Sequence, residues 1–275
     1  MWVIHNNEII LESELNITSS NRAFLYGDGF FETIGVKDGE VRFLKDHLSR
    51  VRRGAKVLSF DLPKEFSDEG LLSELIKNLL SKNSLNDCGA IVKIIIWRKE
   101  GGKYEPQQTE VEYLIKVGAK SWDKEVKVLN KLALYNDFVN VYSPISSIKS
   151  ISSSNYVLAG IYKKENELED LIILGEDRTI SECLYSNIFW FENEVLYTPS
   201  YLTGCIDGVM KKQILKSCIE NGISFQEGAY GLNDLLEADF VFNANVSGFN
   251  IIESFEGKKF ELTMPLFDKL IKKLK

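Results

Sequence analysis

Residues 21–33 read Asn21-Arg22-Ala23-Phe24-Leu25-Tyr26-Gly27-Asp28-Gly29-Phe30-Phe31-Glu32-Thr33 and lead into a predicted β-hairpin. The hairpin has an apolar run at residues 30–36, a turn at Lys37-Asp38-Gly39 and a second run at residues 40–43. An Asp-Gly pair between two such runs is a strong hairpin signal. We therefore expect the first part of the chain to combine strands with helices.

The segments on either side of this hairpin support that expectation. Another hairpin is expected at the N-terminus, where residues 2–4 and 8–11 flank the polar turn His5-Asn6-Asn7. Apolar residues at three- and four-residue steps predict one helix from Leu44 to Leu58 and a second over residues 71–80. Two long strands are expected near residues 90–97 and 111–118.

A polar stretch, residues 119–125, is predicted to link two domains. The first is an α/β domain, residues 1–118, and the second comprises residues 126–275. In the second domain we expect strands at residues 126–134, 170–174, 187–191, 194–197 and 240–243, and helices at residues 155–165, 208–220 and 265–274. Many short strands and several helices without regular alternation favour an α+β fold over a doubly wound sheet.

The composition is that of an ordinary globular protein, with 44% hydrophobic and 27% charged residues among 275. A net charge of −7 argues against nucleic acid as a partner, because a nucleic-acid-binding protein normally carries a basic stripe. The chain lacks both a signal-peptide pattern and a run long enough to span a membrane, so we expect a cytoplasmic protein. Its four cysteines are then expected to be reduced thiols, and with two histidines no metal site is expected.

Lys149 is the first candidate for a chemical role. It follows a predicted strand and a turn at Pro144, and it precedes a helix that serine and asparagine residues can cap. Most lysines beside serines are solvated, because lysine is rarely buried. Imine chemistry instead requires a rigid and partly desolvated lysine, because only the neutral amine attacks a carbonyl. The position of Lys149 is compatible with this second role.

Glu182 is the second candidate, just ahead of the strand predicted at residues 187–191. Taken alone, it would be interpreted as a carboxylate on a surface turn. The alternative is a carboxylate beside a pyridine nitrogen, which keeps that nitrogen protonated because a nearby opposite charge favours the cationic form. A protonated ring is the better electron sink for a carbanion at the substrate's α-carbon.

The third candidate is the start of the helix predicted at residues 208–220. Asp207 and Gly208 lie where free backbone N–H groups and the positive end of the helix dipole can bind a phosphate. Helix starts are common, so this pattern alone is not specific. Arg50 could add a bidentate guanidinium contact to the same phosphate, although an arginine on a helix is more often solvated.

Together these segments resemble the class IV aminotransferases, the fold type IV pyridoxal phosphate (PLP) enzymes. That family includes branched-chain aminotransferases, D-amino-acid aminotransferases and aminodeoxychorismate lyases. Residues 22–32 resemble its R-x-x-x-x-G-D-G-x-F-E signature, and His47-Leu48-Ser49-Arg50 resembles its H-x-x-R motif. Three further matches follow in the family's order: the Lys149 segment, Glu182 with Asn187, and Tyr197-Thr198-Pro199 with the helix start at Gly204 and Gly208. The likeness covers nearly the whole chain.

The resemblance implies a two-domain architecture with a small α/β sandwich domain and a larger pseudo-barrel domain. The second domain, residues 126–275, would bind pyridoxal 5'-phosphate. Lys149 would form the Schiff base with this cofactor and move the substrate proton. Glu182 would pair with the pyridine nitrogen, and Ile206 would pack on the face of the ring.

Further roles are implied for the phosphate and the substrate. The phosphate would be held by Arg50, by the backbone N–H groups of Val209 and Met210, and by the loop at Asn245, Val246 and Ser247. Phe31 and Glu32 would line the substrate pocket. The sequence departs from the family pattern at Lys211, where arginine is usual, and at Ile251-Ile252, where Pro-Val is usual. The tyrosine that often follows the lysine is not matched either, since Ser153 has the nearest position and Tyr156 comes later.

The reaction depends on the substrate pocket, where the resemblance is least informative. Residues 97–104 lack the Arg-x-His carboxylate trap of D-amino-acid aminotransferases, and the Arg-Pro element of branched-chain enzymes is missing too. Val92-Lys93, residues 98–104 and Glu182-Cys183 look similar to aminodeoxychorismate lyases, which would release pyruvate and leave 4-aminobenzoate for folate synthesis. We therefore expect such a lyase, with a small-molecule amino substrate. The alternatives are an amino-acid transaminase of branched-chain type and a non-catalytic PLP-binding protein. Family members are usually homodimers, which implies a homodimer here.

Overall fold

The computed structural model describes residues 1–86, 88–122 and 126–274. It divides the chain into two compact units, of which the first comprises Met1–Trp122 with Ile148–Ser152. The second comprises Asp123–Ser147 with Ser153–Lys275. Part of the predicted linker, residues 123–125, lies outside the described residues, so the boundary between the two predicted domains stays a prediction.

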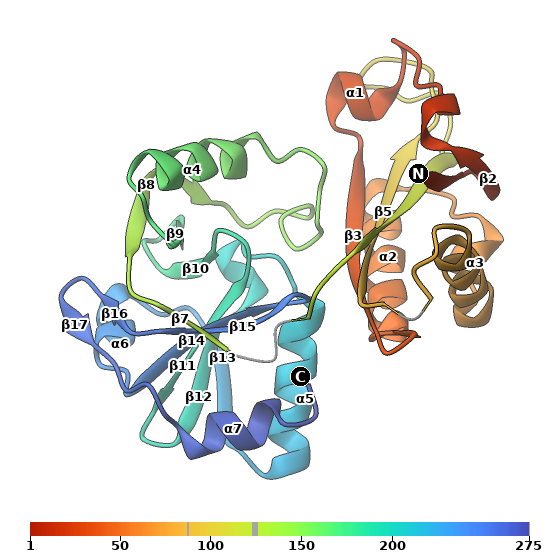
Figure 1. The fold of residues 1–275 in the computed structure, drawn as a ribbon. Coiled ribbons are helices and arrows are strands. Elements are labelled where there is room, and N and C mark those ends of the chain that lie inside the picture. Colours follow the sequence, from red (N-terminus) through yellow and green to blue (C-terminus); the bar gives the residue numbers. More distant parts are fainter. Residues whose placement is uncertain (87, 123–125, 275) are drawn as a thin grey trace. The chain divides into compact units, whose positions relative to one another are not determined.

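The first unit is built on a six-stranded antiparallel sheet with the strand order β2-β1-β6-β5-β3-β4 (Figure 1). Both predicted hairpins and both long strands are confirmed. The turn between β3 and β4 has positive φ at Asp38 (52°) and Gly39 (75°), as a two-residue hairpin requires. The strands are β1 (Trp2–His5), β2 (Glu8–Leu11), β3 (Gly29–Lys37), β4 (Glu40–Val41), β5 (Ala90–Arg98) and β6 (Val111–Ala119).

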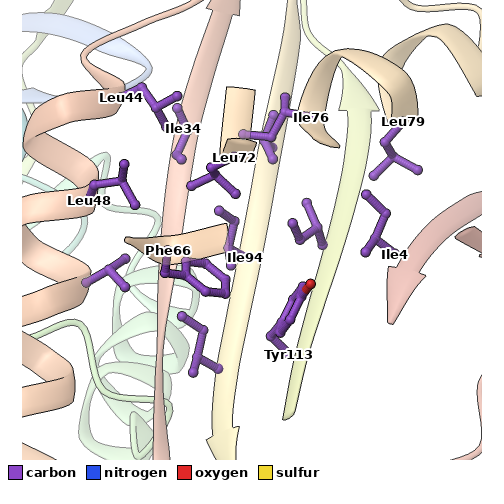
Figure 2. Close-up of a cluster of buried hydrophobic side chains, with 14 of the residues drawn as sticks. Ile4, Ile34, Leu44, Leu48, Phe66, Leu72, Ile76, Leu79, Ile94 and Tyr113 are labelled. Atoms are coloured by element: carbon purple, nitrogen blue, oxygen red, sulfur yellow. The ribbon is translucent and has the colours of Figure 1, made fainter. Parts of the chain in front are cut away.

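Two long helices bury one face of this sheet, and both were predicted from their apolar spacing. Ile34 and Ile94 from the sheet meet Leu48 and Leu72 from the helices in one buried cluster (Figure 2). Full burial of each such side chain stabilises the fold by ~1.5–3 kcal/mol. The helices of this unit are α1 (Arg22–Tyr26), α2 (Leu44–Leu58) and α3 (Glu69–Lys82), with short 3-10 turns η1 (Glu12–Glu14) and η2 (Lys64–Phe66).

Residues 148–152 return to the first unit and pair with the edge of β3. Phe31 N donates to Lys149 O at 2.8 Å, and Ile151 N donates to Gly29 O at 3.1 Å. Only glycine fits at position 29, because a Cβ there would lie 2.4 Å from the carbonyl oxygen of Ile96. Lys149 is therefore part of the first unit, although the sequence-based division assigns it to the second domain.

The second unit contains a three-stranded sheet, β10-β9-β8, and a six-stranded sheet, β13-β12-β11-β14-β15-β7. The single strand predicted at residues 126–134 is wrong. It is interrupted at Asn130 and Lys131, whose backbone N–H groups donate to the Glu169 carboxylate at 2.6 and 3.0 Å. The strands are β7 (Lys127–Leu129), β8 (Leu132–Asn140), β9 (Asp170–Gly175), β10 (Ile180–Cys183), β11 (Asn187–Glu192), β12 (Val195–Pro199), β13 (Phe225–Gly228), β14 (Phe240–Asn245), β15 (Gly248–Ile252), β16 (Ser254–Phe255) and β17 (Lys258–Lys259).

Helices cover both sheets of the second unit. Ala159 of α4 packs on the three-stranded sheet, and Ile172 and Trp190 from the two sheets share one buried cluster. On the six-stranded sheet, the Phe242 ring contacts Phe267 of α7, and α5 runs beside α7 (Figure 1). The helices are α4 (Ser154–Glu165), α5 (Val209–Asn221), α6 (Leu232–Leu236) and α7 (Pro265–Ile271), with η3 (Tyr201–Thr203). This arrangement confirms the α+β prediction. No helix within the described residues has the length and apolar character to cross a membrane.

Candidate functional site

Lys149 shares one face of the first sheet with Phe31 and Lys93. Phe30 pairs with Ser150, which places Phe31 opposite Lys149, and Lys93 of β5 pairs with Thr33. The Nζ atoms of Lys93 and Lys149 lie 4.6 and 5.1 Å from the centre of the Phe31 ring. A cation is attracted to the face of an aromatic ring at this range. Two amines therefore meet at Phe31: that of Lys149, the predicted Schiff-base lysine, and that of Lys93, which the sequence indicated only through the likeness of Val92-Lys93 to aminodeoxychorismate lyases.

Glu32 points to the opposite face of β3, because neighbouring side chains on a strand alternate. Its carboxylate accepts hydrogen bonds from Arg50 Nε and Nη2, both at 2.7 Å, and contacts His47 Nδ1 at 2.6 Å. Burial alone would raise the pKa of Glu32, but the charge of Arg50 and the hydrogen bonds of Arg50 and His47 lower it to about 2. Phe31 and Glu32, predicted to line one pocket, thus lie on different faces. The phosphate role of Arg50 stays a prediction.

Glu182 lies on β10 in the second unit and is only 3% exposed, so it is not a surface-turn carboxylate. Its Oε1 accepts hydrogen bonds from the Tyr156 hydroxyl at 2.6 Å and from Asn140 Nδ2 at 3.1 Å. Its Oε2 accepts one from the backbone N–H of Ile206 at 3.2 Å. Donors on a carboxylate favour its ionised form. The structure therefore brings Glu182 and Ile206 together, as predicted, around a buried carboxylate that can bind a cation.

Asn140 and Tyr156 were missed as partners of Glu182. Asn140 ends β8, where nothing in the sequence marks it, since one asparagine at a strand end is ordinary. For Tyr156 the sequence predicted no role, because it lies farther from Lys149 than the tyrosine of the family pattern. The structure places its hydroxyl on Glu182 from the first turn of α4.

Asn187 and Gly208 lie at the N-terminus of α5 and leave its first turn without a side-chain cap. Gly208 is the N-cap residue and provides no side-chain hydrogen bond to the first turn, which contains Val209 and Met210. Asn187 Nδ2 donates to Ile206 O at 2.9 Å, and a Cβ at position 208 would lie 2.1 Å from Asn187 Oδ1. Glycine is therefore required here, and the first N–H groups of a 13-residue helix are available to an anion.

The predicted second phosphate loop, residues 245–247, lies next to β11, the strand that begins at Asn187. Asn187 pairs with Ala244 of β14, and Asn245 and Val246 follow Ala244 along the chain. Asn245 is already engaged, because its Nδ2 donates to Tyr185 O at 3.0 Å and its Oδ1 accepts from Ser247 N at 2.7 Å. The side chain of Asn245 thus shapes the turn, and the role of this loop in phosphate binding stays a prediction.

Lys211, which departs from the family pattern, is 1% exposed. Its Nζ donates to Pro199 O at 2.6 Å and forms an ion pair with Glu227 at 2.7 Å. The lysine therefore ties the first turn of α5 to the end of β12. These contacts give it a structural reason to be in place of the arginine.

Residues 29–252 match the amino-transferase class IV family. The chain belongs to this family. Among its relatives, aminodeoxychorismate lyase of Bacillus subtilis (strain 168) is 28% identical over 252 residues, which are 87% of this chain and 81% of that protein. D-alanine aminotransferase of Bacillus licheniformis is 26% identical over 247 residues, covering 88% and 83%.

Two solved structures have the same fold as this chain. The branched-chain amino acid aminotransferase of Escherichia coli has a TM-score of 0.84 at 20% identity, over 99% of this chain and 92% of that one. The 4-amino-4-deoxychorismate lyase of Pseudomonas aeruginosa has a TM-score of 0.82 at 22% identity, over 99% and 97%. The expected fold type IV architecture is thereby confirmed.

Class IV aminotransferases are PLP-dependent enzymes, and one solved relative, a hypothetical aminotransferase from Mycobacterium tuberculosis, is a PLP-bound form. The residues of this chain fit the cofactor. A buried carboxylate with three donors, Glu182, suits a protonated ring nitrogen, and the uncapped start of α5 suits a phosphate. Lys149 offers an amine beside an aromatic ring for the aldehyde.

Proposed function

We propose that this PLP-dependent enzyme is an aminodeoxychorismate lyase, which converts 4-amino-4-deoxychorismate to 4-aminobenzoate and pyruvate for folate synthesis. The observation that carries the proposal is the pair of amines, Lys149 and Lys93, at the Phe31 ring. The substrate has two carboxylates, one on its ring and one on the enolpyruvyl group. A second amine near Lys149 can bind one of them, whereas a branched-chain amino acid would bring an apolar side chain to this charge.

The hydrogen bonds of Arg98 within the protein also support the lyase over a D-amino-acid transaminase. Arg98 lies in the segment where those enzymes have their carboxylate trap. Here its Nε donates to Asp28 at 2.9 Å and its Nη2 donates to Leu58 O at 2.7 Å, and the residue is 6% exposed. A guanidinium held in this way has its donors committed within the protein.

Each predicted site residue would have its own role in this reaction. PLP supplies an aldehyde that condenses with amines and a ring that accepts electrons from the substrate. Lys149 Nζ would hold the aldehyde carbon and then move the proton of the substrate carbon that bears the amino group. Lys93 would bind a substrate carboxylate while the C–O bond to the enolpyruvyl group breaks. Glu182 would hold the proton at the ring nitrogen, and the N–H groups of Val209 and Met210 would bind the phosphate, with Ile206 against the ring.

The test is incubation of the PLP-loaded protein with aminodeoxychorismate, with 4-aminobenzoate measured by chromatography. Wild type should form it, and Lys149→Ala should lose activity by at least about three orders of magnitude. Hydride reduction and peptide mapping should label Lys149. Lys93→Ala should keep that label and raise KM about tenfold or more, because a charge-assisted hydrogen bond is lost.

Lys99→Ala is the matched control, because Lys99 is exposed and paired with Glu110 at 2.7 Å. It should leave KM unchanged. Absence of 4-aminobenzoate, together with conversion of PLP to the pyridoxamine form by amino acids, would replace the lyase with a transaminase. A protein that binds PLP without either reaction would be a non-catalytic PLP-binding protein.

We also propose that the enzyme is a cytoplasmic homodimer, as the family resemblance implies. Support comes from the apolar surface of α1. Phe24 is 76% exposed, and Tyr104, 92% exposed, contacts Tyr26 with ring centres 5.7 Å apart. Contiguous exposed apolar side chains on a globular protein mark interaction surfaces.

A further inference from the structure

Two elements of the second unit, α4 and β8, each bring a donor to one oxygen of Glu182. Tyr156, from the start of α4, donates its hydroxyl to Oε1 at 2.6 Å. Asn140, from the end of β8, donates its amide to the same oxygen at 3.1 Å and to Ser181 Oγ at 3.0 Å. Glu182 itself lies on β10. The tyrosine contact is the shorter one, as expected for a hydroxyl that donates to an ionised carboxylate.

We propose that Tyr156 is a positioning residue of the reaction, which keeps the Glu182 carboxylate ionised and oriented toward the cation that it is to bind. This inference rests on the proposed role of Glu182 beside the cofactor's ring nitrogen. It concerns a tyrosine that acts through Glu182, and not one that contacts the substrate.

The surroundings of the pair support this role. Burial, followed by the charge and the hydrogen bond of Glu182, raises the pKa of Tyr156 far above its usual value, so the hydroxyl remains a donor. Burial and the charge of Glu182 likewise raise the pKa of Cys205 to about 12, so this thiol stays neutral. A carboxylate that is only 3% exposed needs such donors, because burial otherwise favours its neutral, protonated form.

Removal of the hydroxyl has a defined consequence. In Tyr156→Phe, Glu182 Oε1 loses the hydroxyl that donates to it at 2.6 Å, so the carboxylate binds a proton more strongly. The proton that Glu182 should share with the ring nitrogen then moves toward Glu182, and the ring is a weaker electron sink. We expect kcat to fall about 10- to 100-fold, the range that one hydrogen bond to a charged group covers, with KM little changed.

The experiment loads wild type, Tyr156→Phe and Tyr162→Phe with PLP that carries ¹⁵N in its ring and measures the ring-nitrogen chemical shift. Tyr162 is the matched control, because it lies on the same helix and its ring packs on Tyr135, with centres 5.3 Å apart. Wild type and Tyr162→Phe should show the shift of a protonated ring nitrogen. Tyr156→Phe should move toward the shift of a neutral nitrogen.

A Tyr156→Phe protein with the wild-type shift and the wild-type kcat would overturn the inference. If this variant does not fold, Asn140→Ser tests whether donors to Oε1 keep the ring nitrogen protonated, because it removes the amide that donates to the same oxygen and should move the shift in the same direction. The proposed function fails in a different way. A wild type that binds PLP at Lys149 but forms no 4-aminobenzoate would refute the lyase, while the ring-nitrogen shifts would still decide the role of Tyr156.

Discussion

At the scale of single residues, the cluster of Glu32, Arg50 and His47 illustrates how the first unit buries charge. Each member is at most 6% exposed, and the carboxylate accepts from both partners. A buried ion pair contributes little over an apolar pair, but removal of one partner is costly because the other charge stays buried. The cluster therefore fixes Arg50 on α2 and makes the unit sensitive to any change at Glu32.

Glu32→Gln should lower the free energy of unfolding of the cofactor-free protein by ~3–5 kcal/mol, measured by urea denaturation at pH 7. Because the pKa of Glu32 is lowered to about 2 in the folded state, its contribution is present above about pH 4.5 and is lost as the pH falls toward 2. The difference between wild type and variant should therefore shrink with acid.

Glu110→Gln serves as the control for this prediction. Glu110 pairs with Lys99 but is 62% exposed, so the loss should stay below ~1 kcal/mol. Equal losses in the two variants would show that burial does not set the cost at Glu32. A difference between Glu32→Gln and wild type that does not change with pH would contradict the lowered pKa.

The roles of Glu32 and Tyr156 also show where prediction from sequence ends at this scale. Phe31 and Glu32 match one motif, yet the pleat sends them to opposite faces. Most of β3 is buried on both faces, so alternation of polar and apolar residues could not reveal which face is which. Tyr156 meets Glu182 across 26 positions of sequence, a contact that only tertiary packing creates.

At the level of helices and strands, segments with a clear apolar pattern were predicted better than segments without one. Helix α2 has the predicted bounds, Leu44–Leu58, because its apolar spacing runs over four turns. The predicted strand over residues 126–134 was wrong, because Glu169 captures two of its N–H groups from elsewhere in the chain. Strand β10, which carries Glu182, is four residues long and fully buried, so it has no alternating pattern to detect.

The role of the α5 N-terminus in phosphate binding can be tested at Gly208. Gly208→Ala would place a Cβ 2.1 Å from Asn187 Oδ1, so Asn187 or the helix start must shift. If the first N–H groups of α5 bind the cofactor phosphate, the Kd for PLP should rise about tenfold or more, as when a hydrogen bond to a charged group is lost. Titration of the cofactor-free protein by absorbance or fluorescence measures this Kd.

Gly160→Ala is the matched control on α4, because its new Cβ would meet only the Tyr185 hydroxyl at an ordinary 3.8 Å. This variant should bind PLP like wild type, and alanine should slightly stabilise the helix. Wild-type affinity in Gly208→Ala would place the phosphate elsewhere than at α5.

At the scale of the whole molecule, the chain passes between its two units more than once. Residues 148–152 are only five, yet they pair with β3 and bring Lys149 into the first unit. A boundary drawn once along the sequence cannot represent such a return. The sequence indicated Lys149, Phe31 and Lys93 separately, through the family resemblance, but only the strand register shows that the three side chains lie together.

The proposed homodimer can be tested at the exposed side chains of α1. If the exposed apolar surface of α1 forms the interface, Phe24→Asp should convert the protein from dimer to monomer in size-exclusion chromatography with light scattering, because the charge cannot be buried without a partner. Ile219→Asp is the control, since Ile219 is 71% exposed on α5, a comparable apolar side chain in the second unit. This variant should remain a dimer. A monomeric wild type would refute the homodimer, and a dimeric Phe24→Asp would move the interface away from α1.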